Sequence, residues 1–205
     1  MLKIWGRLSS INVQKVVWCA RALGLDFERV DAGGAFGVVD APSFRLLNPN
    51  GKVPVVEDDG LVLWESNAIL RYLCARHAGA GLCPEDRGES ARCDQWMDWQ
   101  ATELTPAMRV AFIQLVRTPP ADRQQSLIDE SLEQTESLVG VLDAALAARS
   151  FIVGDRFTMA DIPLACALHR WYAMPVVRRE RPGLESWLER CRAQAGAREA
   201  LVPLS

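Results

Sequence analysis

The spacing of hydrophobic positions changes near residue 80 and divides the chain into two parts. Before that point, short apolar runs alternate with amphipathic stretches. The runs "LKIW" and "FERVDA" predict strands on either side of a helix that contains "VQKVVWCARALG". Gly24 marks the end of that helix. A strand, a helix and a second strand in this order predict a β-α-β unit with parallel strands and a right-handed crossover.

The remainder of the first part continues the mixed pattern. A Gly-rich loop, "AGGAFG", precedes a short helix predicted at "APSFRLLN". Two apolar runs, "VPVVED" and "LVLWES", are joined by "DDG", which predicts a hairpin turn. A helix follows at "SNAILRYLCARHAG". We therefore expect an α/β domain over residues 1–80.

After a linker at "GAGLCPEDRG", the period is helical, and we expect an all-α domain over residues 87–205. Pro106 lies inside one of the predicted helices, where it should kink the helix or remove one hydrogen bond. Two apolar stripes at helical spacing predict a core between helices. They consist of Met97, Leu104, Met108, Ala111 and Leu115, and of Ile128, Leu132, Thr135, Val139, Leu142 and Leu146.

Composition narrows the class of protein. The 205 residues are 49% hydrophobic and 24% charged, as in soluble globular proteins. No apolar run approaches the ~20 residues that span a bilayer, and the first residues lack a secretory signal, so we expect a cytoplasmic protein that does not bind membranes. A net charge of -3 argues against nucleic acid as a partner. The six scattered cysteines include no C-x-x-C pair, which predicts reduced thiols and no metal site.

The stretch "SSINVQKVVW" places two hydroxyls and an amide where the first strand meets the first helix. Ser9, Ser10 or Asn12 can cap the helix, which is the common structural role of such residues. Alternatively, one of them donates a hydrogen bond to an anion bound at the helix start, where unpaired N–H groups and a partial positive charge gather. The local sequence leaves both roles open.

Four segments in order resemble the soluble, cytosolic glutathione S-transferases, in particular a bacterial Ser-type, theta- or zeta-like class. They are "SSINVQKVVWCARALGLDFE", "FRLLNPNGKVPVVEDDGLVLWESNAILRYL", "FIVGDRFTMADI" and "PGLESWLERC". The second is the most specific. The resemblance implies a thioredoxin-like N-terminal domain that binds glutathione as co-substrate, and an all-helical C-terminal domain that binds a small apolar electrophile. It also implies a homodimer, no metal, and a role in detoxification.

The resemblance also implies the residues that hold glutathione. In "WES", the N–H and hydroxyl of Ser66 would bind the γ-glutamyl carboxylate, while Glu65 would face the ammonium or cap the helix. In "KVP", Pro54 would follow a cis peptide bond and Val53 would pair its backbone with the cysteinyl part. Lys52 has two readings, a solvated loop residue or a contact to the glycyl carboxylate.

The residue that stabilises the glutathione thiolate follows by resemblance as well. In the Ser-type classes the catalytic serine precedes the glycine that closes the first helix by fourteen positions, which gives Ser10 here. In the cysteine-type bacterial class the corresponding position is two residues later, at Asn12, whose amide can also donate to sulfur. Ser10 is the first candidate and Asn12 the second, while Ser9 is expected to be a cap or loop residue.

The predicted function is therefore that of an enzyme that conjugates reduced glutathione to electrophilic small molecules. Two alternatives remain within catalysis, a glutathione-dependent disulfide or peroxide reductase and an isomerase of a maleyl-type substrate. A non-catalytic binding protein with the same fold is the alternative outside catalysis. A subset of five apolar residues in the helical half is expected to line the electrophile pocket: Trp96, Trp99, Met108, Phe112 and Trp171. In "TMAD", we expect Thr158 to cap a helix and Asp161 to reach back to it.

Overall fold

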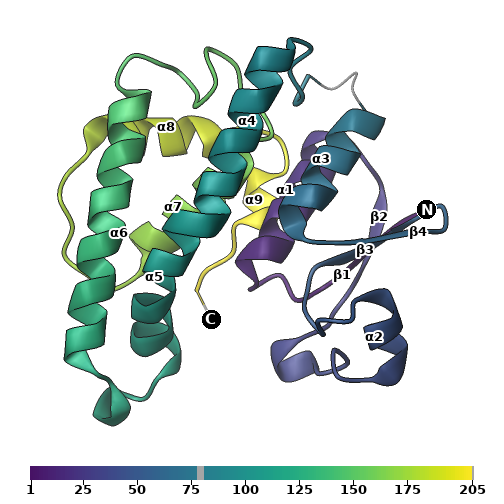
Figure 1. Ribbon diagram of the computed structural model, residues 1–205, viewed down its shortest axis with the longest axis horizontal. Helices are drawn as coiled ribbons and strands as arrows, with labels where there is room; N and C mark the ends of the chain where they lie inside the picture. Colours follow the sequence, from purple (N-terminus) through teal and green to yellow (C-terminus); the bar gives the residue numbers. More distant parts are fainter. Residues whose placement is uncertain (78–80, 205) are drawn as a thin grey trace. The chain divides into compact units, whose positions relative to one another are not determined.

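A computed structural model describes residues 1–77 and 81–204. The chain forms two compact units (Figure 1). The first contains Met1–Pro84 and Ala193–Val202, and the second contains Glu85–Arg192 and the residues from Pro203 onward. The end predicted for the first domain, residue 80, lies outside the described residues.

The first unit is built on a four-stranded sheet with the order β2-β1-β3-β4. Strands β1 and β2 are connected by helix α1 and pair in parallel, as the β-α-β pattern predicted. Strand β3 runs antiparallel to both β1 and β4. The hairpin predicted at "DDG" is confirmed. The elements of the unit are β1 Leu2–Trp5, α1 Ile11–Ala22, β2 Phe27–Val30, η1 Gly34–Phe36, α2 Pro42–Leu47, β3 Val55–Asp58, β4 Leu61–Trp64 and α3 Ser66–Arg76.

Helices cover both faces of this sheet. Figure 1 shows α1 and α3, which pack against each other, on one face and α2 on the other. The alternation of strand side chains explains the two layers. Trp5 of β1 meets Phe44 of α2 edge to face, with ring centroids 6.0 Å apart, and by this alternation its buried neighbour Ile4 lies on the opposite face of the sheet. The thioredoxin-like arrangement expected from the sequence is confirmed.

The second unit is helical. Its two predicted stripes are confirmed as core, because all but two of their residues are fully buried, and α5 packs along α6. None of the helices in the described part of the chain has the length and apolar content needed to cross a membrane. The elements are α4 Arg87–Trp99, η3 Gln100–Leu104, α5 Thr105–Phe112, η4 Ile113–Arg117, η5 Pro120–Asp122, α6 Gln125–Leu146, α7 Asp161–Ala173 and α8 Pro182–Arg192.

The disturbance predicted at Pro106 is present as a π-helical segment. The η3 segment has π geometry and ends at Leu104, and Pro106 lies in the first turn of α5. A proline has no N–H to donate, and the first turn is where a missing donor is tolerated. A second π-helical segment, η4, begins directly after Phe112. Helix α5 is therefore an eight-residue α-helix between two π turns.

The C-terminal segment belongs to the first unit, although it falls within the range 87–205 expected for the helical domain. Its short helix α9, Ala197–Ala200, packs on α1 with Ala197 and Ala200 buried. Gly196 precedes it in a left-handed conformation (φ 81°). A Cβ atom there would lie 2.5 Å from Cβ of Arg21 and 3.1 Å from the carbonyl oxygen of Trp18.

Asp161 organises the second unit, and only part of the prediction made from "TMAD" is confirmed. Its buried carboxylate accepts hydrogen bonds from the backbone N–H groups of Ile152 (2.9 Å) and Thr158 (3.0 Å), from the Thr158 hydroxyl (3.1 Å) and from the Trp187 indole (3.0 Å). Asp161 thus reaches back as predicted. The predicted cap is wrong, because the Thr158 hydroxyl donates to this carboxylate and Ala160 occupies the cap position of α7. Burial raises the pKa of the Asp161 carboxyl, and these hydrogen bonds oppose the shift.

Gly196→Ala should destabilise the protein more than Gly24→Ala. Both glycines have positive φ in the first unit, so each alanine costs about 1–2 kcal/mol in backbone strain. Only the Gly196 variant also collides with α1, which should add roughly 1–3 kcal/mol, since an added Cβ at Gly24 meets nothing within 4 Å. Urea unfolding of both variants measures the difference. Equal losses would show that α9 is not packed as described.

Asp161→Ala should lower the free energy of unfolding by about 3 kcal/mol or more, because it leaves several buried donors without an acceptor. The matched control is Asp155→Ala, an exposed aspartate of the same unit, for which a change within about 0.5 kcal/mol is expected. Urea unfolding followed by tryptophan fluorescence compares them. A loss at Asp161 no larger than at Asp155 would contradict the role given to its carboxylate.

Candidate active site

Ser10 lies at the junction between β1 and α1, and its hydroxyl forms no hydrogen bond with the other described residues. Ser10 has extended backbone angles and occupies the cap position of α1, yet its side chain makes no capping hydrogen bond. Its backbone N–H donates to the Arg7 carbonyl (3.1 Å), and its carbonyl accepts from Gln14 N–H (2.9 Å). Within the described part of the chain the hydroxyl has no hydrogen-bond partner. The capping role considered for Ser10 is therefore not the one that the structure adopts.

The two neighbouring polar residues differ from each other. Ser9 accepts a long hydrogen bond of 3.4 Å from the Arg7 guanidinium, in keeping with the loop role expected for it. Asn12 is the second residue of α1 and is half-buried, and among the described residues its amide has no partner. No acidic residue lies in the first turn of α1, so no carboxylate there offsets the partial positive charge of the helix start.

Val53 lies against this junction. The Val53–Pro54 peptide bond is cis, as the family resemblance implied. A Cβ atom added to Gly6, four residues before Ser10, would be 3.1 Å from Cβ of Val53 and 2.4 Å from Cγ2 of Val13. The backbone N–H and C=O of Val53 make no hydrogen bond with other described residues and lie outside the strand ladder. An open backbone edge therefore adjoins the loop that leads into α1.

Asn48 shapes the loop that carries Lys52 and Val53. Its buried side-chain amide donates to the Lys52 carbonyl (2.8 Å), and its Oδ1 accepts from the backbone N–H and the amide of Asn50 (3.0 Å each). Asn48 was not among the site residues predicted from the sequence, although "NPNGKVP" contains it. Lys52 itself is exposed and, among the described residues, forms no ion pair.

At the start of α3, as at the start of α1, the residue in the cap position does not cap the helix with its side chain. Glu65 has a positive φ of 72°, which a non-glycine residue rarely adopts and which often marks functional sites. It occupies the cap position of α3, but its side chain does not cap the helix, so this alternative for Glu65 is excluded. Its carboxylate is exposed and lacks an ion-pair partner in the described part of the chain. Ser66 follows as the first helical residue and is buried.

All seven predicted residues lie in the first unit. No hydrogen bond or ion pair joins the side chains of Ser10, Lys52 and Glu65 to one another. The structure therefore gives two helix starts with unused polar side chains, together with an unpaired backbone edge beside one of them. This combination can receive a small molecule that carries carboxylate, ammonium, amide and thiol groups.

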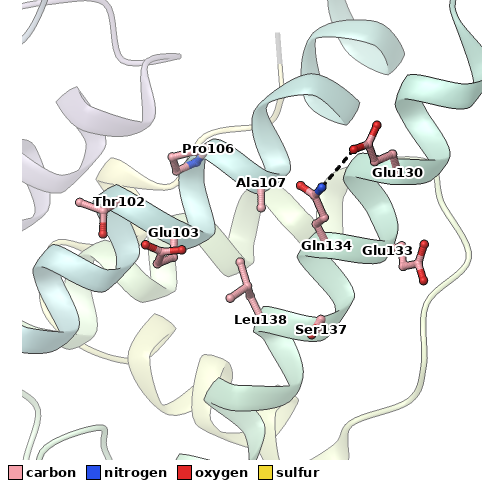
Figure 2. A pocket seen from close by; sticks show the side chains of 9 residues that line it. All are labelled: Thr102, Glu103, Pro106, Ala107, Glu130, Glu133, Gln134, Ser137 and Leu138. Carbon is pink, nitrogen blue, oxygen red and sulfur yellow. Dashed lines mark hydrogen bonds between the residues drawn. The ribbon is translucent and has the colours of Figure 1, made fainter.

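Three of the apolar residues considered for an electrophile pocket, Met108, Phe112 and Trp171, are core residues with exposed fractions of 2%, 4% and 3%. Trp96 and Trp99 are half-buried and meet edge to face, with centroids 5.2 Å apart. A groove of about 670 Å³ lies in the second unit between η3, the start of α5 and α6. Figure 2 shows the side chains that line it. The groove is lined by Thr102, Glu103, Pro106, Ala107, Glu130, Glu133, Gln134, Ser137 and Leu138. None of the predicted site residues lines it.

The thiols of the chain take no part in this arrangement. The six cysteines form no disulfide, and all but the half-buried Cys83 are buried, as expected for reduced thiols. Cys19 and Cys74 are 3.7 Å apart between α1 and α3, and their hydrogen bond together with burial raises the pKa of Cys19.

Comparison with known proteins identifies the family. Residues 1–75 match the family described as "Glutathione S-transferase, N-terminal domain", and residues 104–195 match "Glutathione S-transferase, C-terminal domain". The chain belongs to the glutathione S-transferase family. All predicted glutathione contacts, from Ser10 to Ser66, lie within the match to the N-terminal domain.

Individual glutathione S-transferases resemble the chain over its whole length. It is 36% identical to glutathione S-transferase GstB of Escherichia coli K12, with all of both chains covered. A theta-class enzyme from Xanthomonas axonopodis pv. citri, solved with glutathione bound, is 43% identical with a TM-score of 0.96, covering 100% of this chain and 99% of that one. Glutathione transferase F7 of Populus trichocarpa is 25% identical, with complete coverage of both chains and a TM-score of 0.90.

Proposed function

We propose that this protein binds reduced glutathione in its first unit and conjugates it to electrophilic small molecules. The observation that carries the proposal is the Ser10 hydroxyl, which occupies the cap position of α1 but leaves the helix N–H groups uncapped. A hydroxyl held there without a protein partner is available to donate to a ligand sulfur. The membership of the chain in the glutathione S-transferase family supports the identity of that ligand.

The chemical task of the site is to keep the bound thiol ionised. A free thiol has a pKa near 8.5 and is only a few per cent thiolate at neutral pH. Lowering the pKa by about two units corresponds to ~2.7 kcal/mol of preferential stabilisation of the anion. A hydrogen bond to a charged group contributes about 1.5–3 kcal/mol, and the start of α1 adds a favourable field. Ser10 donates this bond without ionising, and Asn12 is the alternative donor.

The other groups of glutathione bind to protein groups at the start of α3 and in the loop before β3. Ser66 binds the γ-glutamyl carboxylate through its N–H and hydroxyl at the start of α3, and Glu65 faces the ammonium. The unpaired backbone of Val53, which precedes Pro54, pairs with the cysteinyl part. Lys52 contacts the glycyl carboxylate. In conjugation, the thiolate sulfur forms a bond to the electrophilic carbon, and the leaving group departs with its bonding electrons.

Partners and location form part of the same proposal. We assign the small apolar electrophile to the helical unit, and we expect a homodimer in the cytoplasm that serves detoxification. These expectations rest on the family to which the chain belongs. Sedimentation of the purified protein measures its oligomeric state directly.

Ser10→Ala should lower kcat roughly ten- to hundredfold with an aryl halide, because one charge-assisted hydrogen bond to the thiolate is lost. The KM for glutathione should change by no more than about threefold, since the other contacts remain. The ultraviolet absorbance of the bound thiolate, followed across pH, should show its pKa moving toward that of free glutathione.

Asn12→Ala is the matched variant two residues later. If it lowers kcat and raises the thiolate pKa while Ser10→Ala does neither, Asn12 is the donor. A small disulfide assayed in parallel separates conjugation from reductase activity. Failure of the wild-type protein to bind glutathione–agarose would contradict the proposal as a whole.

Glu65→Gln should raise the Kd for glutathione about tenfold, because the ammonium loses its counter-charge. An analogue of glutathione without that ammonium should bind the wild-type protein and the variant equally. Titration calorimetry measures both ligands. The control is Asp26→Asn, an exposed carboxylate of the same unit that has no ion-pair partner among the described residues, and it should leave both affinities unchanged. Equal weakening of both ligands by Glu65→Gln would mean that Glu65 acts on the fold rather than on the ammonium.

A further inference from the structure

Two arginines from different helices stack on one buried aromatic ring in the helical unit. The guanidinium carbon of Arg170, on α7, is 4.2 Å from the centroid of Phe112, and that of Arg117 is 4.9 Å from it. Phe112 is 4% exposed, whereas Arg117 is exposed and Arg170 is half-buried. Two positive charges are thus held within 5 Å of the same ring.

The π-helical segment η4 explains how Arg117 reaches this ring. In an α-helix, residues five apart point about 140° away from each other, so Arg117 would not lie over Phe112. A π-helix closes its hydrogen bonds between residues five apart, which brings such residues onto one face. The N–H of Thr118 donates to the carbonyl of Ile113 (3.0 Å), which is a bond of this kind. Helical π segments often occur at functional sites.

The charge of Arg117 has no structural use within the described part of the chain. The cation–π contact with Phe112 is its one interaction there, and it forms no ion pair. Two other arginines of the unit, Arg123 and Arg181, have evident structural roles. Arg123 donates to the carbonyls of Thr118 and Leu115, and Arg181 forms ion pairs with Glu136 and Asp143.

The groove of Figure 2 has the opposite electrostatic character. Three carboxylates, those of Glu103, Glu130 and Glu133, line it and would repel an anion. An anionic ligand of the helical unit is therefore favoured at the arginine pair and disfavoured in the groove.

We propose that Arg117, with Arg170 beside it, binds a carboxylate on the electrophile, so that the preferred substrates are electrophiles with an apolar body and one anionic group. A guanidinium binds a carboxylate through two parallel hydrogen bonds while its face stays stacked on an aromatic ring. This inference rests on the proposed function. With an aryl halide, the thiolate forms a bond to the ring carbon that carries chlorine, and chloride leaves with the electron pair of the broken bond. The carboxylate is unchanged by the reaction.

The test compares a chloronitrobenzoate with the matching neutral chloronitrobenzamide. In the wild-type protein, kcat/KM should be higher for the benzoate. Arg117→Gln should lower kcat/KM for the benzoate about tenfold and leave the benzamide within about twofold. Arg109→Gln is the control, since Arg109 is an exposed arginine of α5 with no ion-pair partner among the described residues, and it should change neither substrate.

Direct binding gives a readout that does not depend on turnover. Titration calorimetry of the benzoate without glutathione should show binding to the wild-type protein and about tenfold weaker binding to Arg117→Gln. Absence of wild-type binding, no preference for the benzoate, or an equal loss of both substrates in Arg117→Gln would overturn the inference and leave the proposed function intact. If the wild-type protein does not bind glutathione–agarose yet binds the benzoate through Arg117, the proposed function fails while an anion site on the helical unit stands.

Discussion

The close contact at Gly6 determines how the first unit presents its polar groups. A side chain at this position would collide with Val13 of α1 and crowd Val53, so only a glycine lets these segments approach one another. The contact places the open backbone edge of Val53 beside the loop that ends at Ser10. A helix start supplies partial positive charge, and an unpaired edge supplies a donor and an acceptor. Both are available to one peptide-like ligand because Gly6 has no side chain.

Polar groups in this protein fall into two contrasting sets. Asp161 is buried, and every donor around it is used, which is what a structural carboxylate in a low-dielectric interior requires. Ser10 and Glu65 lie at helix starts where capping would be the simple structural role, and neither side chain caps its helix. Their unused hydrogen-bonding capacity lies in the first unit, where glutathione is proposed to bind.

In the helical unit, irregular helix geometry determines where one exposed charge lies. Pro106 cannot donate a backbone hydrogen bond, and the π segment before it accommodates the change. The second π segment turns Arg117 onto Phe112, so a core ring carries an exposed cation. In a regular α-helix, residues five apart point about 140° away from each other, so this charge would be directed elsewhere. Backbone irregularity thus contributes a chemical feature to a unit whose apolar stripes serve folding.

Local signals along the chain were enough to predict several elements of the fold. The β-α-β unit, the hairpin at Asp59 and Gly60, the stripes of α5 and α6 and the cis bond before Pro54 were all predictable, from periodicity, turn residues or family motifs. The tertiary structure alone decided that the Thr158 hydroxyl donates to Asp161, that α9 packs on α1 and that Arg117 stacks on Phe112. The packing of α9 depends on which distant segments meet, whereas the contacts of Thr158 and Arg117 depend on small departures from ideal helix geometry. Such features leave no repeating pattern along the chain. The spacing of hydrophobic residues shows which face of an element is buried, but it does not show which partner covers that face.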